Sequence, residues 1–341
     1  MRGGGWFLVA AVSLVFPPLR CQNRSREETR TEFPRSAAAE ADFCSFREKF
    51  HRNYELNTEE FNRRHLYFQD AIKRAAYLNS FPAAPHSAKY GINQFSDLSL
   101  NEFRDLYLRA SADKAPPYSG EKREGLPAKF DWRDEGVLAP VQNQQACGSC
   151  WAFSVVEAIQ AAHARAGSPL EQLSVQQVLD CSFRNQGCSG GSTVWALSWL
   201  NQTRVKLVPQ SEYPYKAKTG ICHFFSQSHG GVALKDFAAH DFSGQEEAMM
   251  GQLVSCGPLA VTVDAISWQD YLGGIIQHHC SSQHANHAIL LIGYDTTGDI
   301  PYWILQNTWG TKWGNEGYAY VKIGGNICGK YDPCWFIYMY F

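Results

Sequence analysis

The sequence lacks three features that would assign it quickly to a common class. Its 31 basic and 33 acidic residues give a net charge of −2, so no global basic field is available to hold nucleic acid or an anionic membrane. No uninterrupted apolar stretch reaches the roughly 20 residues that a membrane helix needs. Internal repeats and low-complexity tracts are also absent. We therefore expect neither nucleic-acid binding nor membrane insertion.

Cysteine, by contrast, is abundant, with 11 residues in 341. An apolar run over residues 6–16 lies between Arg2 and Pro17, which is the layout of a secretory signal peptide. We predict that residues 1–21 are removed and that the rest enters an oxidising compartment, where cysteines are usually bridged. Glycosylation sequons at Asn23 and Asn201 fit this route.

The density of charged residues divides the chain near residue 125. Residues 22–125 hold 17 basic and 16 acidic side chains in 104 positions, whereas residues 126–341 hold 12 and 17 in 216. Within the charge-dense part, apolar residues at helical spacing predict one helix over residues 43–77. The residues that carry this pattern are Phe46, Phe50, Phe61, Phe68, Ile72 and Ala75.

The end of the charge-dense part has a different pattern. Ser99 and Glu102 have the spacing of a capping box, which predicts a short helix over residues 99–108. Prolines, a serine and a run of charges over residues 110–125 then predict an exposed, protease-accessible linker.

The remainder has helical patterns first and strand patterns later. A broad apolar face predicts a helix over residues 150–166, and Ser174 with Gln177 starts another. Short β-like runs follow at residues 259–263, 288–294, 301–306 and 317–323. This order predicts an α+β fold with two lobes and disfavours a repeating βαβ sheet.

Cys150 is the strongest candidate for chemistry. A cysteine in the first turn of a helix meets unpaired N–H groups and the positive end of the helix dipole, which favour its thiolate. A thiolate nucleophile needs a base, for which His287 is the candidate, and Asn307 could orient that base. Trp309 could shield their hydrogen bond from water, and Gln144 could donate to the oxygen of an attacked carbonyl.

The segment Cys147-Gly148-Ser149-Cys150-Trp151 resembles the nucleophile motif of papain-like cysteine proteases, which also have a distant His and Asn. Residues 188–191, 307–314 and 126–133 resemble further landmarks of that family. Residues 263–280 are most similar to one particular member.

The charge-dense part is similar to the inhibitory propeptide of the same family. Glu60, Arg64, Phe68 and Asn79 match a spaced pattern of its cathepsin L-like branch, and residues 91–97 match a second landmark. The resemblance implies a helical propeptide over residues 22–125, followed by a mature peptidase domain with the two-lobed papain-like fold over residues 126–341.

The resemblance also implies roles for individual residues. Cys150 is expected to be the nucleophile, His287 the general base and acid, Asn307 its orienting group and Gln144 the oxyanion donor. The implied disulfides are Cys147–Cys188, Cys181–Cys222 and Cys280–Cys328. Residues expected to bind the substrate are Gly190, Gly191, Ser192, Thr193, Thr262, Ala285, Ala288 and Trp309.

The implied protein is a cysteine endopeptidase of the lysosome, reached through the secretory pathway, with secretion as a second destination. Its partners are expected to be protein and peptide substrates, its own propeptide as an intramolecular inhibitor, and cystatin-type inhibitors. It is expected to be a monomer and to need no metal and no organic cofactor. Acid is expected to release the propeptide by protonating carboxylates such as those of Glu60 and Asp97.

Two positions depart from the family pattern. Gln145 stands where glycine is usual beside the oxyanion donor, which is expected to tilt that loop. The tail over residues 330–341 replaces a serine-containing strand at the specificity pocket and holds Pro333 and Cys334.

Three other interpretations remain open from the residues. Cys147 and Cys150 form a C-x-x-C pair, which is typical of thiol-disulfide oxidoreductases. A group of imidazoles and a thiolate could bind zinc, namely His278, His279, Cys280, His284 and His287. A catalytically silent peptide-binding relative would have the same fold.

Overall fold

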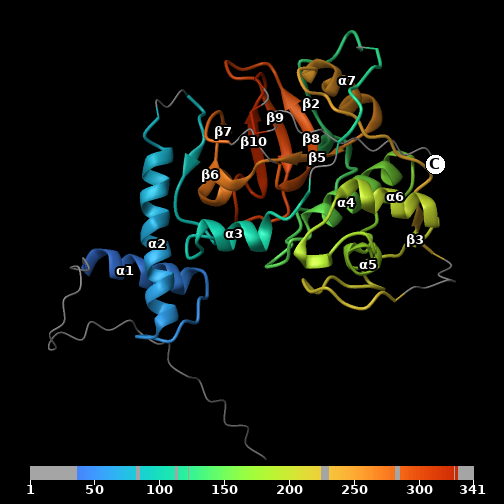
Figure 1. Ribbon diagram of the computed structural model, residues 1–341. Helices are drawn as coiled ribbons and strands as arrows, with labels where there is room; N and C mark the ends of the chain where they lie inside the picture. The colour runs from blue at the N-terminus through green and yellow to red at the C-terminus, as the bar shows by residue number, and fades with distance from the viewer. Residues whose placement is uncertain are drawn as a thin grey trace, which may run out of the picture. The chain divides into compact units, whose positions relative to one another are not determined.

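The structure, a computed structural model, describes residues 37–81, 85–111, 114–121, 123–223, 230–280, 285–325 and 327–328 (Figure 1). The predicted signal peptide, Asn23, His284 and the tail over residues 330–341 lie outside these residues. The chain divides into two compact units, Met1–Thr58 and Glu59–Phe341. Within the described part, no helix has the length and apolar character required to cross a bilayer.

The first unit contains one described helix, α1 (Ala37–Lys49). The Arg47 guanidinium donates to the Tyr54 carbonyl at 2.5 Å, beyond the end of the helix. The chain then turns, with left-handed φ angles of 53° at His51 and 63° at Asn57. The prediction of one continuous helix over residues 43–77 is therefore wrong, because a turn that Asn readily adopts interrupts the apolar pattern.

The second unit begins with α2 (Glu59–Leu78). Asn79 follows it and bonds twice to Tyr90, donating to its carbonyl at 2.8 Å and accepting from its N–H at 3.0 Å. Ile72, predicted to face inward, is 38% exposed, because the buried stripe turns around the helix with the 3.6-residue period. The buried residues of α2 are Phe61, His65, Phe68, Ala71, Ala75 and Leu78.

Helix α3 (Leu100–Tyr107) begins at the predicted capping box. Ser99 accepts from the Glu102 N–H, and the Glu102 carboxylate accepts from the Ser99 N–H at 3.0 Å. The prediction for this helix is confirmed. The helix ends at Tyr107, which is the first residue of the segment that crosses the candidate site.

Four helices follow, α4 (Cys150–Arg165), α5 (Val175–Cys181), α6 (Thr193–Thr203) and α7 (Glu246–Cys256). Helix α4 is buried along most of its length, and α5, α6 and the sheet lie around it (Figure 1). Ser174 accepts from the Gln177 N–H as the N-cap of α5. The helices predicted at residues 150 and 174 are therefore confirmed. Short 3₁₀ helices are Trp132–Glu135, Gly187–Ser189 and Ile266–Asp270.

A six-stranded sheet forms the β-rich part of the unit, with the order β2-β8-β9-β10-β7 and β5 also paired with β8. All pairs are antiparallel except β7 with β10. Its strands are β2 (Lys129–Asp131), β5 (Leu259–Val263), β7 (Ile275–Ile276), β8 (His287–Asp295), β9 (Tyr302–Gln306) and β10 (Tyr318–Lys322). Two small sheets pair β1 (Lys89–Tyr90) with β6 (Tyr271–Gly273), and β3 (Lys206–Leu207) with β4 (Val232–Ala233). The α+β prediction is confirmed.

The linker predicted over residues 110–125 is only partly exposed. Ala110 is buried, and Tyr118 stacks on Phe242 with ring centroids 4.4 Å apart. The Tyr118 N–H donates to the Asp241 carbonyl at 2.8 Å. The prediction is therefore wrong for these positions, because Ala110 pairs with Gly191 and Tyr118 bonds to Asp241 and packs on Phe242, whereas Ser119 to Glu121 are exposed.

Candidate active site

Cys150 is the first residue of α4 and is fully buried. The loop before it is held by the Cys147–Cys188 disulfide and by a bond from the Gly148 N–H to the Cys188 carbonyl at 2.9 Å. The backbone of Ala288 interacts with the Cys150 thiol. The fold therefore brings the start of α4 against the start of β8.

His287 is the first residue of β8, directly before Ala288. Its Nε2 lies 2.8 Å from Asn307 Oδ1, which also accepts from the Thr308 N–H at 2.8 Å. Because the amide oxygen accepts both bonds, Nε2 carries the proton and donates, which leaves Nδ1 for another partner. The Trp309 ring lies 4.7 Å from the imidazole, and all these side chains are buried.

Gln144 lies between the two halves of the site with its amide fully bonded. Its Oε1 accepts from Thr308 Oγ1 at 2.7 Å and from Trp309 Nε1 at 3.1 Å. Its Nε2 donates to the Cys147 carbonyl at 2.8 Å and to the Tyr107 carbonyl at 3.2 Å. These partners fix the orientation of the amide, so that its N–H₂ group faces the segment that crosses the site.

That segment, residues 107–111, is paired with the peptidase part through its backbone. The Gly191 N–H donates to the Arg109 carbonyl at 3.0 Å, and the Ser111 N–H donates back to the Gly191 carbonyl at 2.9 Å. On the other side, the Ala110 N–H donates to the Asn286 carbonyl at 3.0 Å. An extended peptide thus already occupies the space beside Cys150 and His287.

Aromatic rings from the same part of the chain surround Trp309. Phe95, Phe103 and Tyr107 lie 5.5, 5.2 and 6.4 Å from the indole between ring centroids. The Gln94 amide donates to the Trp309 carbonyl at 2.8 Å. This packing excludes water from the side of the His287–Asn307 bond on which Trp309 lies.

Burial changes the ionisation of both candidate side chains. Burial raises the pKa of the Cys150 thiol, and nearby backbone bonds only partly oppose it. Burial lowers the pKa of His287 to about 4, although the Asn307 bond opposes this. In the covered state, burial therefore opposes the thiolate that a position at a helix start favours.

Two of the residues predicted to bind the substrate, Gly190 and Gly191, lie against the same segment. A Cβ on Gly190 would come within 2.5 Å of the Arg109 carbonyl, so only glycine allows this close approach. Ser192 accepts from the Trp195 N–H as the N-cap of α6. Thr262 is paired with Ala288 across β5 and β8. Thr193, Ala285 and Ala288 are buried.

The structure contains the three implied disulfides, Cys147–Cys188, Cys181–Cys222 and Cys280–Cys328. The first removes Cys147 from the C-x-x-C pair, which contradicts the oxidoreductase interpretation. The third removes Cys280 from the zinc interpretation. Among the residues that the structure describes, no group of three His, Cys, Asp or Glu side chains is arranged to hold a metal.

The structure also describes Gln145, a departure from the family pattern, and Asn201, a predicted glycosylation site. Gln145 has a left-handed φ of 54°, which explains why glycine is favourable there. Asn201 lies in the last turn of α6 and is half-buried, and Thr203 of its sequon donates to the Trp199 carbonyl at 2.7 Å.

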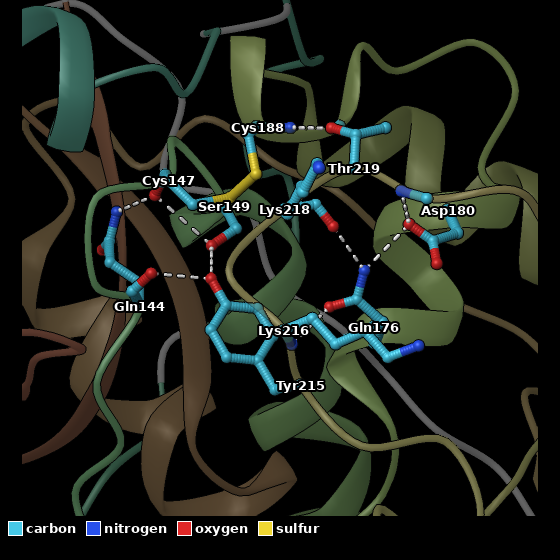
Figure 2. Close-up of a disulfide and its surroundings, with 12 residues drawn as sticks. Gln144, Cys147, Ser149, Gln176, Asp180, Cys188, Tyr215, Lys216, Lys218 and Thr219 are labelled. Carbon is cyan, nitrogen blue, oxygen red and sulfur yellow. Dashed lines mark hydrogen bonds between the residues drawn. A yellow bond between two sulfur atoms is a disulfide. The ribbon is translucent and has the colours of Figure 1, made fainter.

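Sequence reasoning missed Tyr215 and Ser149. Their side-chain oxygens lie 2.7 Å apart, and the Tyr215 hydroxyl donates to the Gln144 carbonyl at 2.7 Å (Figure 2). Tyr215 lies 71 positions from Gln144 in the chain, and no spacing pattern connects them. Ser149 could have been noted as the residue directly before the nucleophile.

Comparison with known proteins places these features in one family. Residues 126–335 match the model of the papain family cysteine proteases, and residues 43–103 match the cathepsin propeptide inhibitor domain. The chain is 57% identical over 271 residues to cathepsin O of Homo sapiens, covering 78% of this chain and 84% of the relative. It is 56% identical to cathepsin O of Mus musculus, covering 77% and 86%. Cathepsin O is the member to which residues 263–280 are similar.

Solved structures agree with this assignment. The digestive procathepsin L 3 of Tenebrio molitor larval midgut is 31% identical, with a TM-score of 0.77 over 89% of this chain and 100% of the other. A recombinant stem bromelain precursor is 30% identical, with a TM-score of 0.78 over 89% and 99%. With a propeptide inhibitor domain before its peptidase domain, the chain belongs to the papain family of cysteine proteases.

Proposed function

We propose that the chain is the inactive precursor of a lysosomal cysteine endopeptidase. In this proposal Cys150 is the nucleophile, His287 the general base and acid, Asn307 its orienting group and Gln144 the oxyanion donor. The observation that carries it is the Tyr107 carbonyl, which accepts from Gln144 and also interacts with His287. A peptide carbonyl of the chain itself thus lies beside the proposed base and oxyanion donor.

The proposed reaction is acyl transfer. After the covering segment leaves, a proton passes from the Cys150 thiol to His287, and the thiolate attacks a peptide carbonyl. Gln144 stabilises the oxyanion, and His287 gives its proton to the leaving amine, which yields a thioester on Cys150. His287 then deprotonates a water molecule that hydrolyses the thioester. In the precursor, the raised thiol pKa and the lowered imidazole pKa oppose the first proton transfer.

Gly191 is proposed to bind the substrate backbone. Its N–H and carbonyl already bond to Arg109 and Ser111, which supports recognition of an extended chain. The proposed subsites involve Gly190, Ser192, Thr193, Thr262, Ala285, Ala288 and Trp309.

The proposed processing removes residues 1–21 as signal peptide and residues 22–125 as propeptide, which leaves residues 126–341 as the mature domain. Asn23 and Asn201 are the proposed glycosylation sites. The relatives' name, cathepsin O, supports a lysosomal destination. Co-fractionation of the expressed protein with a lysosomal marker tests this destination, and accumulation only in the medium would contradict it.

Thiol-directed labelling tests the proposed nucleophile. Full-length chain activated at acid pH should gain one adduct of a peptide epoxide, measured by intact mass and mapped to Cys150, and Cys150→Ser should gain none. Hydrolysis of a fluorogenic peptidyl amide should disappear in the same variant. A folded, propeptide-free chain that binds peptides without forming the adduct would instead be a catalytically silent relative.

A further inference from the structure

Tyr215 connects the loop that carries Gln144 to the residue directly before the candidate nucleophile. Its hydroxyl donates to the Gln144 backbone carbonyl at 2.7 Å and lies 2.7 Å from Ser149 Oγ. Burial raises the pKa of Tyr215, so the hydroxyl keeps its proton and remains a donor. Figure 2 shows the phenol ring pointing into the loop, with both bonds at its oxygen.

The side chain of the oxyanion donor is held as well, because Gln144 Nε2 donates to the Cys147 carbonyl at 2.8 Å. With the Tyr215 proton on the Gln144 carbonyl, the Ser149 hydroxyl donates to the Tyr215 oxygen. Tyr215 therefore holds the backbone of Gln144, and Cys147 holds its side chain. Because Cys147 is also bonded to Cys188, this network has a covalent anchor on the other side of the loop (Figure 2).

Tyr215 is itself held in place by a neighbouring helix. Gln176 of α5 is fully buried, and its Oε1 accepts from the Lys216 N–H at 2.8 Å while its Nε2 donates to the Lys218 carbonyl at 2.8 Å. These two bonds fix the chain directly after Tyr215 (Figure 2). The Phe153 ring of α4 lies 4.9 Å from the phenol ring, almost perpendicular to it. The hydroxyl thus has little freedom to move away from Gln144.

We propose that Tyr215 is a positioning residue that fixes Gln144 as the oxyanion donor during acyl transfer. The inference rests on the proposed role of Gln144. An oxyanion donor acts through preorganisation, since it must already point at the place where negative charge develops. Without the Tyr215 hydroxyl, the Gln144 carbonyl loses its bond and the loop gains freedom, so the side-chain N–H₂ no longer occupies one position.

The variant Tyr215→Phe tests the proposal, because it keeps the ring and removes only the hydroxyl. In the acid-activated full-length chain we expect kcat for a fluorogenic peptidyl amide to fall about tenfold, with KM within twofold. Alkylation of Cys150 by iodoacetamide forms no oxyanion, so its rate should stay within twofold. Equal losses in hydrolysis and alkylation, or an unchanged kcat, would overturn the proposal.

Tyr213→Phe is the matched control, because Tyr213 lies in the same segment but its hydroxyl donates to Asp180 Oδ2 at 2.8 Å. Tyr213→Phe should leave kcat within twofold. A tenfold loss in this control would show that any loss of a hydroxyl bond in the segment lowers kcat, which would overturn the proposal. In a Gln144→Ala background, Tyr215→Phe should cause no further loss of kcat, since both act on one donor. A full additional tenfold loss would overturn the inference alone, whereas unchanged activity of Gln144→Ala would remove the proposed oxyanion role as well.

Discussion

The propeptide part of the second unit contacts the peptidase part in two chemically different regions. Beside Cys150, the contacts are backbone bonds such as that of Arg109 with Gly191, together with aromatic rings around Trp309. Along residues 266–280, backbone bonds such as that from the Gly91 N–H to the Asp270 carbonyl are joined by ionisable groups, namely the Arg74–Asp270 ion pair and histidines next to aromatic rings. Ionisable contacts are therefore a feature of the second region.

The ionisable region contains two kinds of contact. The buried Asp270 carboxylate accepts two bonds from the Arg74 guanidinium, which oppose the desolvation of its charge. Burial and the neighbouring His278 lower the pKa of His279, whose ring lies 4.2 Å from Phe81. Protonation below about 6.5 therefore weakens the second contact.

The surroundings of Glu60 and Asp97 bear on the expectation that their protonation releases the propeptide. Glu60 lies 3.6 Å from Arg64, four residues along the same helix, and its side chain is 51% exposed. Protonating Glu60 would therefore break a contact inside the propeptide rather than one with the peptidase part. Asp97 is almost fully buried. We propose that the histidines contribute to the pH response of the closed state.

Glu157→Gln is expected to have the largest effect. It tests whether a buried carboxyl that lies away from the propeptide destabilises the fold when it is charged. Burial in α4 raises the pKa of Glu157 to about 8, and Gln306 opposes this only in part. The protonated group stabilises the fold below about 4.5, and this contribution is lost as pH rises to about 8. At pH 8 the variant should be more stable by about 4 kcal/mol at most, measured by denaturant unfolding, with a smaller difference at pH 5.

The exposed Glu171→Gln is the control for that experiment and should change stability little at either pH. Equal effects of Glu157→Gln at pH 5 and pH 8 would show that Glu157 does not bind a proton on folding.

Asp270→Asn tests the buried ion pair. The variant leaves the Arg74 guanidinium, which is 18% exposed, without a charged partner. We expect about a hundredfold faster opening at pH 7, since breaking a buried pair is costly. Opening is measured by hydrogen exchange of residues 107–111 in the Cys150→Ser precursor. Asp70→Asn, which removes an exposed pair with Lys73 on the same helix, should change the rate less than twofold, and an equal effect would contradict the comparison.

Ala110→Pro tests the region beside Cys150. Proline removes the N–H that bonds to the Asn286 carbonyl, so opening should be about tenfold faster, by the same factor at pH 5 and pH 7. Hydrogen exchange of Ser111 and Gly191 in the Cys150→Ser precursor reports it. The exposed Ser119→Pro is the control and should leave exchange unchanged. A tenfold effect at one pH only would show that this region also responds to pH.

The double variant His278→Gln, His279→Gln has the smallest expected effect, because His278 is exposed and His279 is only partly buried. The ratio of the opening rate at pH 5 to that at pH 7 should fall about two- to threefold, by the same exchange measurement. His51→Gln, in the first unit, should leave the ratio unchanged. A ratio unaffected by the double variant would locate the acid response elsewhere.

The sequence predicted most of the helices and strands for identifiable local reasons. The capping side chains of Ser99 and Ser174 mark the starts of α3 and α5, and residues 259–263 form β5 as predicted. It failed at residues 50–58, where apolar spacing alone did not reveal a turn. Left-handed residues such as Asn57 interrupt a helix without changing the hydrophobic pattern on either side.

Likewise, the sequence predicted some residues of the candidate site and missed others. Cys150, His287, Asn307 and Gln144 could be named from the sequence, because their residue types and flanking motifs indicate a type of chemistry. Tyr215 could not, since a hydroxyl that donates to a backbone carbonyl leaves no motif.

The sequence by itself determined the chemical groups, the local caps and the family resemblance, because these depend on residue type and on short spacing. Only the tertiary structure decided how the groups behave. Burial raises the pKa of the Cys150 thiol and lowers the pKa of His287, so both groups favour their neutral forms. Burial and long-range contact are properties of segments far apart in the chain, and no local pattern encodes them.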